Sequence, residues 1–186
     1  MLSHYLDINL EPDLDFSISH LMNALFSKLH RALVELDSQD IGISFPRADY
    51  LHLGSCLRLH GSLGRLEQLM ALNWLKGMRD HVDLCAILPV PEDCKYRLVC
   101  RVQSDSNPEL LRRRYIKRHN VSHEEAVKLI PDSSAKRLNL PFLSLKSQST
   151  GQAFLLFIDQ CTILNEPKSG VFNRYGLSQQ ATIPWF

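Results

Sequence analysis

The sequence predicts an α+β fold in two domains, residues 1–94 and residues 95–186, on three observations. Short segments that alternate apolar and polar residues, as half-buried strands do, recur in both halves. Between them lie stretches with apolar residues at helical spacing, several of them preceded by a serine that can cap a helix. Charge is unevenly divided, since residues 1–94 carry 7 Lys and Arg against 13 Asp and Glu, and residues 95–186 carry 14 against 7. The second half, with a net charge of +7, is therefore expected to bind a polyanion.

Composition bears on the class of protein and its compartment. The five cysteines are odd in number and include no CxxC pair, so neither a disulfide framework nor a zinc site is predicted. We expect free thiols in a reducing compartment. No apolar run reaches the length of a membrane span, and acidic residues interrupt the N-terminus where a signal peptide would be apolar. The expectation is a soluble, cytoplasmic protein that does not bind a membrane.

In the first domain the expected order of elements is β-α-β-β-α-β. The strands are expected at residues 4–10, 41–45, 56–60 and 82–90. Ser17 caps a helix of about 20 residues, whose apolar stripe is Ile18, Leu21, Met22, Leu25, Leu29, Ala32, Leu33 and Leu36. Gly61 and Ser62 open a second helix, with one apolar face made of Leu63, Leu66, Leu69 and Met70. This order is that of the ferredoxin-like unit, which RNA-recognition modules share, although topology does not by itself establish function.

The second domain is expected to be a smaller α+β unit with a basic helix and a β-hairpin. A strand over residues 97–103 leads into the basic helix, and a Ser122–Glu125 capping box starts a short helix that ends before Pro131. Residues 142–146 and 154–158 are predicted to pair as a hairpin across the SQSTG turn. A last strand and turn are expected in VFNRYGLS, residues 171–178.

The basic helix is the most distinctive stretch of the second half. Ser106 can cap it, with Glu109 as its capping-box partner, Pro108 suits its first turn, and Asn120 offers a left-handed end. Its cations are Arg112, Arg113, Arg114, Lys117 and Arg118. The last four share an arc of roughly 140°, and no acidic residue lies among the five to pair with them within the helix. A polyphosphate-binding surface is therefore favoured over the alternative, an ordinary solvated basic face.

Residues that could carry chemistry are few. The eight histidines are scattered without ligand spacing, and neither a phosphate-binding glycine loop nor a nucleophile motif occurs. His30 lies at the edge of the first helix's apolar stripe, which suits either a half-buried core histidine or a proton shuttle. Ser147 and Ser149 flank a tight turn, and Tyr175 precedes Gly176 like an ordinary strand-end aromatic. These residues by themselves leave their roles open.

Several segments together resemble the CRISPR-associated endoribonucleases of type I-F systems, which cut precursor CRISPR RNA at each repeat hairpin. The segments are HYLDI, LFSKLH ending at His30, IGISFP, RVQSDSNPELLRRR, LPFLSLKSQSTGQ followed by Phe154, YGLS and the final PWF. They span nearly the whole chain in the family's order and spacing. SQSTG and the RVQ…SNP…RRR run are specific, whereas YGLS by itself is weak. The resemblance implies a ferredoxin-like N-terminal domain and a C-terminal domain carrying the arginine-rich helix.

The resemblance also implies a reaction that needs neither metal nor cofactor. At the 3′ base of the hairpin, the ribose 2′-hydroxyl would attack the neighbouring phosphate and leave a 2′,3′-cyclic phosphate and a 5′-hydroxyl. His30 would act as the general base on the 2′-hydroxyl, and Ser147 would hold that ribose in the attacking geometry. Tyr175 would help to orient His30 and the backbone.

For RNA binding, the resemblance implies that the basic helix enters the major groove of a short stem. That groove is narrow in A-form RNA but open at the ends of a short stem. Arg101 and Gln103 would read base edges near the bottom of the stem, and Phe154 would stack under the terminal base pair. The other RNA-binding residues are the five helix cations and Ser149. Lys117 stands where the family carries arginine, which keeps the charge but loses the planar fork.

The partners expected from the resemblance are the CRISPR repeat stem-loop, the mature crRNA that stays bound after cleavage, and the other subunits of a type I-F crRNA-guided surveillance complex. Two alternatives stay open. The protein could be a non-catalytic hairpin-binding subunit of a ribonucleoprotein, with its catalytic residues intact but unused. It could also be a generic ferredoxin-like RNA-binding module. Cleavage of repeat RNA in the presence of a chelator separates the enzyme from both alternatives.

Overall fold

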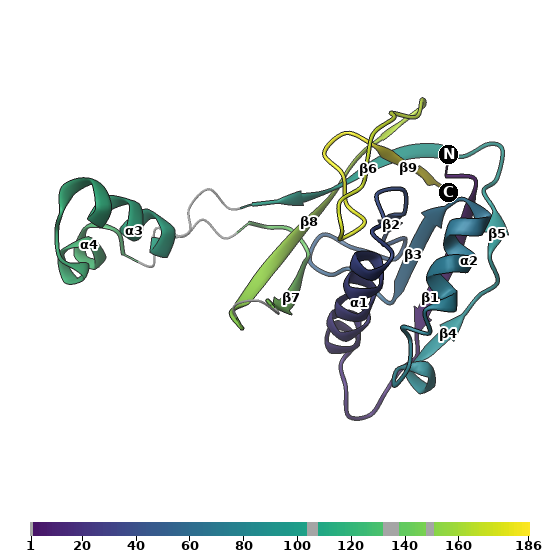
Figure 1. Cartoon of the computed structure of the whole chain (residues 1–186), viewed down its shortest axis with the longest axis horizontal. Helices are drawn as coiled ribbons and strands as arrows, with labels where there is room; N and C mark the ends of the chain where they lie inside the picture. Colours follow the sequence, from purple (N-terminus) through teal and green to yellow (C-terminus); the bar gives the residue numbers. More distant parts are fainter. Residues whose placement is uncertain (1, 104–107, 132–137, 148–150) are drawn as a thin grey trace. The chain divides into compact units, whose positions relative to one another are not determined.

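The computed structural model describes residues 2–103, 108–131, 138–147 and 151–186 (Figure 1). By its contacts the chain forms two compact units, one of residues 1–102 and 140–186 and the other of residues 103–139. Within the larger unit, the buried side chains of Val99 and of residues 143–183 share one core with those of residues 6–78, and the expected division at residue 94 stays a prediction. None of the described helices combines the length and apolarity that crossing a membrane requires.

The first sheet of the larger unit is antiparallel throughout, with strand order β2-β3-β1-β4 (Figure 1). Its described strands are β1 (His4–Leu10), β2 (Gly42–Ser44), β3 (Cys56–Gly61), β4 (Val82–Leu84) and β5 (Leu88–Pro89), which also pairs with β1. The first three agree with the expected segments. The expected strand over residues 82–90 is wrong as a single element, because the chain pairs with β1 in two short pieces separated by residues 85–87.

Two capped helices, α1 (Ile18–Glu35) and α2 (Leu63–Ala71), follow β1 and β3. The Ser17 hydroxyl accepts a hydrogen bond from the His20 N–H, and the Ser62 hydroxyl accepts one from the Arg65 N–H, as expected for N-caps. The expected stripe of α1 is buried between Leu21 and Leu33 and also includes Phe26. On α2 the expected apolar face is narrower than predicted, because Leu63 in the first turn is 42% exposed.

The second sheet of the larger unit is also antiparallel, in the order β7-β8-β6-β9. Its described strands are β6 (Lys95–Val102), β7 (Phe142–Lys146), β8 (Ala153–Leu164) and β9 (Thr182–Trp185). The β7–β8 hairpin was expected, although β8 runs six residues beyond the predicted end because it also pairs with β6. The strand expected in residues 171–178 is wrong. That segment is turns and loop, and the last strand is β9, which pairs with the start of β6.

The described part of the smaller unit contains two helices, α3 (Pro108–His119) and α4 (His123–Leu129). α3 is described from Pro108 and ends at His119, and the next residue, Asn120, has a φ of 51°, which is the expected left-handed stop. The Ser122 hydroxyl accepts from the Glu125 N–H while the Glu125 carboxylate accepts from the Ser122 N–H, so the predicted capping box is confirmed. Ser106, the expected cap of α3, lies outside the described residues.

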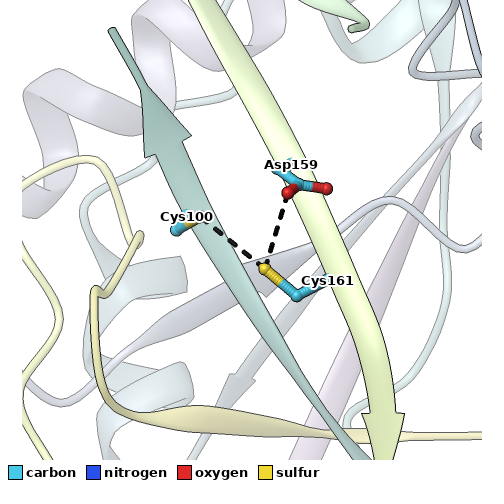
Figure 2. A group of neighbouring side chains, drawn as sticks. All are labelled: Cys100, Asp159 and Cys161. Atoms are coloured by element: carbon cyan, nitrogen blue, oxygen red, sulfur yellow. Dashed lines mark hydrogen bonds between the residues drawn. The ribbon is translucent and has the colours of Figure 1, made fainter.

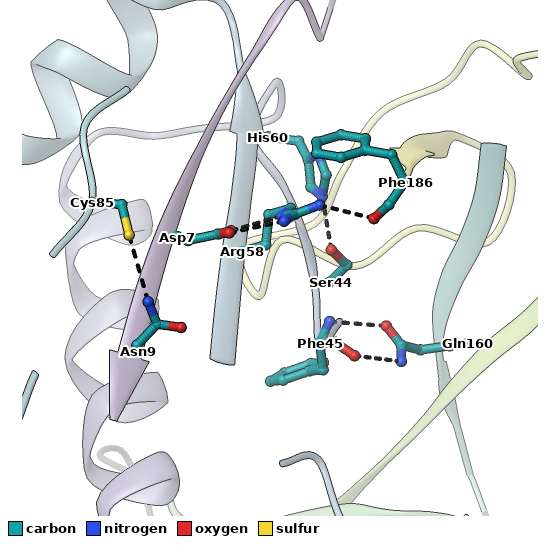
Figure 3. A network of polar contacts seen from close by, with 9 residues as sticks. All are labelled: Asp7, Asn9, Ser44, Phe45, Arg58, His60, Cys85, Gln160 and Phe186. Carbon is teal, nitrogen blue, oxygen red and sulfur yellow. Dashed lines mark hydrogen bonds and ion pairs between the residues drawn. The ribbon is translucent and has the colours of Figure 1, made fainter. Parts of the chain in front are cut away.

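The two faces of the first sheet differ in chemistry because neighbouring residues of a strand point to opposite sides. One face is apolar and buried, made of Leu6, Ile8, Leu10, Ile43, Leu57 and Leu59. The opposite face carries an ion pair in which Arg58 donates two hydrogen bonds, of 2.6 and 2.8 Å, to the Asp7 carboxylate (Figure 3). The same guanidinium lies 4.7 Å from the Tyr5 ring centroid and 4.2 Å from that of Phe186.

His60 lies on this second face and is fully buried. Its Nε2 shares a 2.8 Å hydrogen bond with the Ser44 hydroxyl, and its Nδ1 has no hydrogen-bond partner among the described residues (Figure 3). Burial, with a smaller contribution from the charge of Arg58, lowers the pKa of His60 from 6.5 to about 3. The folded protein therefore holds this imidazole neutral at a pH where the unfolded chain would protonate it.

Stability should fall with acidity because of His60. Since its folded pKa is the lower one, the unfolded state binds the extra proton, and the free energy of unfolding decreases as the pH drops below about 6.5 towards about 3. The contribution of this one group approaches ~1.4 kcal/mol per pH unit. Urea unfolding of the parent and of His60→Gln between about pH 7 and about pH 4 measures it. The free energy of unfolding of His60→Gln should depend less steeply on pH than that of the parent. The control His20→Gln, changed at an exposed site, should show the parental pH dependence. Equal slopes in the parent and His60→Gln would contradict the assignment.

Candidate active site

A cavity of about 620 Å³ lies in the larger unit, between α1, the end of the β7–β8 hairpin and the loop before β9. Its lining residues are Ser27, His30, Arg31, Leu145, Lys146, Ser147, Gly151, Phe154 and Tyr175. The structure thus brings together four residues that were singled out from the sequence, although they come from three segments far apart in the chain. They are His30, Ser147, Phe154 and Tyr175.

His30 is partly buried on α1, and its ring is held on two sides. Its Nδ1 lies 2.8 Å from the carbonyl oxygen of Arg174. Because a carbonyl oxygen can only accept, Nδ1 carries a proton in this hydrogen bond, and Nε2 of the neutral ring has the free lone pair. The Tyr175 ring stacks on the imidazole with centroids 4.1 Å apart and an angle of 11° between the planes. Ring orientation and tautomer are therefore both set by residues 174–175.

Ser147 directly follows β7. Its N–H donates to the Gln152 carbonyl and its own carbonyl accepts from the Gly151 N–H, each at 2.9 Å. The hairpin is tied to α1 by the Ser144 N–H, which donates to the Asn23 side-chain oxygen at 3.0 Å. These bonds fix the backbone of Ser147 relative to the helix that carries His30. Ser149 lies outside the described residues.

Phe154 is partly buried, pairs with Leu145 across the hairpin and packs against the hydrophobic core while also lining the cavity. Two cations of the cavity, Arg31 and Lys146, were missed by the sequence reasoning. Arg31 directly follows His30 in the chain and Lys146 directly precedes Ser147. This adjacency is the signal by which the sequence could have indicated them. A base, a hydroxyl and two cations around one cavity suit a substrate that carries both a hydroxyl and a phosphate. None of the described residues that line the cavity carries a carboxylate.

The five cations of α3 are not equivalent. Arg112 is 6% exposed and its Nε donates to the Ile130 carbonyl at 2.8 Å, so this side chain fastens α4 to α3. Arg113 is exposed, with its Nε 3.3 Å from Glu109. The expectation that these cations lack acidic partners within the helix is wrong for both, because Glu109 lies one turn before them. Arg114, Lys117 and Arg118 are exposed.

The two residues expected to read bases lie at the end of β6. Arg101 is partly buried, and its Nε has no hydrogen-bond partner among the described residues, which leaves a buried donor unsatisfied. Its backbone carbonyl accepts from the Gln179 side chain at 3.0 Å. Gln103 is exposed one residue beyond the strand. No described contact joins either side chain to the cavity.

A cluster that the sequence spacing did not reveal lies across β6 and β8, where the thiols of Cys100 and Cys161 approach each other beside Asp159 (Figure 2). Cys161 donates to the Asp159 carboxylate at 3.6 Å, and the two sulfur atoms are 3.9 Å apart. One donor atom from each of the three lies within 4.8 Å of the others, so the set could hold a thiophilic metal ion. Burial, and to a smaller extent the neighbouring Cys161, raises the pKa of Cys100 to about 12. A metal ion would therefore have to displace the thiol proton in order to bind.

These thiols should be slow to alkylate. Burial and the Asp159 charge raise the pKa of Cys161 as well, and the thiolate is the reactive form. Iodoacetamide labelling near pH 8, followed by mass spectrometry, should modify Cys100 and Cys161 much more slowly in the folded protein than in urea. Asp159→Asn should speed the labelling of Cys161, because it removes a charge that favours the thiol. Rapid labelling of Cys100 in the folded parent would contradict the pKa assignment.

The chain is similar to CRISPR-associated proteins over nearly its whole length. A model of the family described as CRISPR-associated protein (Cas_Csy4) matches residues 5–186. The chain is 49% identical over 187 residues to the CRISPR-associated endonuclease Cas6/Csy4 of Pseudomonas aeruginosa (strain UCBPP-PA14), covering 100% of both chains. It is 45% identical over 185 residues to the protein of the same name from Escherichia coli (strain UTI89 / UPEC), again covering 100% of both. The similarity therefore spans the residues of the cavity and of α3.

Proposed function

The chain belongs to the Cas_Csy4 family of CRISPR-associated proteins, the family that its motifs indicate, and we propose that it is the endoribonuclease that processes precursor CRISPR RNA. The proposed substrate is the repeat stem-loop, cut at the 3′ base of the hairpin. The observation that carries the proposal is one cavity lined both by Ser147 and by His30, whose Nδ1 is bonded to the Arg174 carbonyl so that Nε2 of the neutral ring keeps its lone pair. This pairing suits an attack by a ribose 2′-hydroxyl.

In the proposed reaction, His30 Nε2 removes the proton of the 2′-hydroxyl, and the resulting oxygen attacks the adjacent phosphorus. The bond from phosphorus to the 5′-oxygen breaks, and that oxygen takes a proton from water, to which His30 returns the proton that it removed, so the products are a 2′,3′-cyclic phosphate and a 5′-hydroxyl. Ser147 holds the ribose in line for attack. Tyr175, stacked on the imidazole with ring centroids 4.1 Å apart, fixes the tilt of the ring while His30 acts.

Arg31 and Lys146, which line the same cavity, are assigned a role in catalysis. Their positive charges stabilise the negative charge that develops on the phosphate. The reaction is proposed to be independent of metal. The support is chemical, since hard divalent cations prefer carboxylate oxygens, whereas the described lining offers two positive charges and no carboxylate.

The grip on RNA is assigned to the basic α3, with Arg101 and Gln103 reading base edges and Phe154 stacking under the stem. Arg113, Arg114, Lys117 and Arg118 are the cations available to phosphates, because Arg112 is occupied in fastening α4.

We further propose the ferredoxin-like arrangement for the first sheet, which its strand order β2-β3-β1-β4 and the helices after β1 and β3 support. The functional division at residue 94, product retention and membership of a surveillance complex in the cytoplasm remain predictions.

The role of His30 is tested by single-turnover cleavage of repeat RNA in EDTA. His30→Ala should cleave about 10²–10⁴-fold more slowly while binding the RNA almost as tightly, because a general base acts mainly in the transition state. His20→Ala, on the same helix but outside the cavity, is the matched control and should cleave at the parental rate. Full activity in His30→Ala would refute the assignment. A parent protein that needs magnesium would refute the metal-independent reaction.

The role of α3 is tested by the salt dependence of RNA binding. If about four cations neutralise phosphates, the logarithm of affinity should fall against the logarithm of salt concentration with a slope near −3. The double variant Arg114→Ala with Arg118→Ala should have a slope closer to about −1.5. A control with the same change in charge, Lys76→Ala with Arg79→Ala, alters two exposed cations outside α3 and should keep the parental slope. An unchanged slope in the α3 variant would exclude this helix as the phosphate-binding surface.

A further inference from the structure

The groups that orient His30 both lie in one tight turn, residues 173–177. The Gly176 N–H donates to the Asn173 carbonyl, and the Asn173 N–H donates to the Leu177 carbonyl, each at 2.8 Å. Gly176 has a φ of 72° and its carbonyl accepts from the Ile43 N–H of β2 at 3.0 Å. A Cβ at this glycine would lie 2.6 Å from Ile43 Cγ2, so the closing residue of the turn is docked tightly on β2.

The side chain of Asn173 holds the middle of this turn. Its Oδ1 accepts from the Tyr175 N–H at 2.8 Å and from the Leu177 N–H at 3.3 Å. Between these anchors lie the Arg174 carbonyl, which accepts from His30 Nδ1, and the Tyr175 ring, which stacks on the same imidazole. One amide oxygen therefore sets the two groups that fix the tautomer and the tilt of His30.

We infer that Asn173 is a positioning residue for His30, acting through the Arg174 carbonyl and the Tyr175 ring. The inference rests on the proposed function only for its effect on cleavage, because its effect on the imidazole is a property of the free protein. Asn173 is itself exposed, so replacing it leaves the buried core in place. It does not line the cavity, and its side chain therefore reaches the reaction through its neighbours.

A competing anchor for the turn is the ion pair between Arg174 and Asp37, at 3.0 Å. Its side chains are 59% and 75% exposed, and exposed ion pairs are screened by water and salt. The Asn173 bonds act instead on backbone N–H groups inside the turn, within two and four residues of their acceptor. Asp37→Asn therefore serves as the matched control, because it removes the ion pair with Arg174 and leaves the side chain of Asn173 unchanged.

Two variants isolate the acceptor. Asn173→Leu keeps the size of the side chain and removes its oxygen, whereas Asn173→Asp keeps oxygen atoms in the accepting positions. In single-turnover cleavage of repeat RNA, Asn173→Leu should be about 10–100-fold slower with unchanged RNA affinity. Asn173→Asp should recover most of the rate, and Asp37→Asn should retain it. Equal rates in the parent and Asn173→Leu, or a loss that Asn173→Asp shares in full, would overturn the inference.

A second readout needs no RNA. Long-range nitrogen–proton NMR correlation of the imidazoles, at a pH where His30 is neutral, should find the proton on Nδ1 in the parent and in Asn173→Asp. A mixture of tautomers is expected in Asn173→Leu, because the accepting carbonyl is no longer held in place. If these spectra behave as expected but the parent does not cleave repeat RNA, the proposed function fails while the positioning role stands. If His30 keeps the parental tautomer in folded Asn173→Leu, the positioning role itself is wrong.

Discussion

One apolar core joins the two sheets of the larger unit, and the geometry of the cavity depends on it. Leu6 and Ile43 of the first sheet share this core with Leu156 and Ile183 of the second. At Gly42 there is no room for a side chain, since a Cβ would lie 2.6 Å from Ile183 Cγ2. Because close-packed cores deform little, the helix, hairpin and turn that surround the cavity are held as parts of one body.

Hydrogen bonds then fix the positions of individual groups within the frame that core packing provides. The Gln160 side chain pairs with both the N–H and the carbonyl of Phe45, at 2.9 and 3.0 Å, and so links β8 to the end of β2 (Figure 3). The His30 proton is placed by a backbone carbonyl and not by a carboxylate. This arrangement orients the ring without adding a negative charge next to Arg31 and Lys146, so the positive charge of the cavity stays available to an anionic substrate.

The basic helix shows how one sequence run serves two purposes. Arg112 is nearly buried and bonds to the Ile130 carbonyl, which caps the last turn of the neighbouring helix and fastens α4 in place. Arg114, Lys117 and Arg118 remain exposed on the surface that the proposed function assigns to phosphates. A guanidinium can fill either role because it combines a long apolar stem with a fork of hydrogen-bond donors.

The sequence by itself determined the elements whose causes are local, together with the family. The strands β1 and β7 follow from the alternation of apolar and polar residues. The helix caps at Ser17 and Ser62 follow from short-range side-chain hydrogen bonds, and the left-handed residue after α3, Asn120, follows from its backbone preference. Each of these causes lies among neighbouring residues of the chain. The tertiary structure decided whatever depends on residues far apart in the chain. It split the expected strand at residues 82–90, turned residues 171–178 into the loop that orients His30, and brought Cys100 to Cys161. Spacing along the chain cannot predict these outcomes, because strand register and burial are settled only when distant segments compete for the same core.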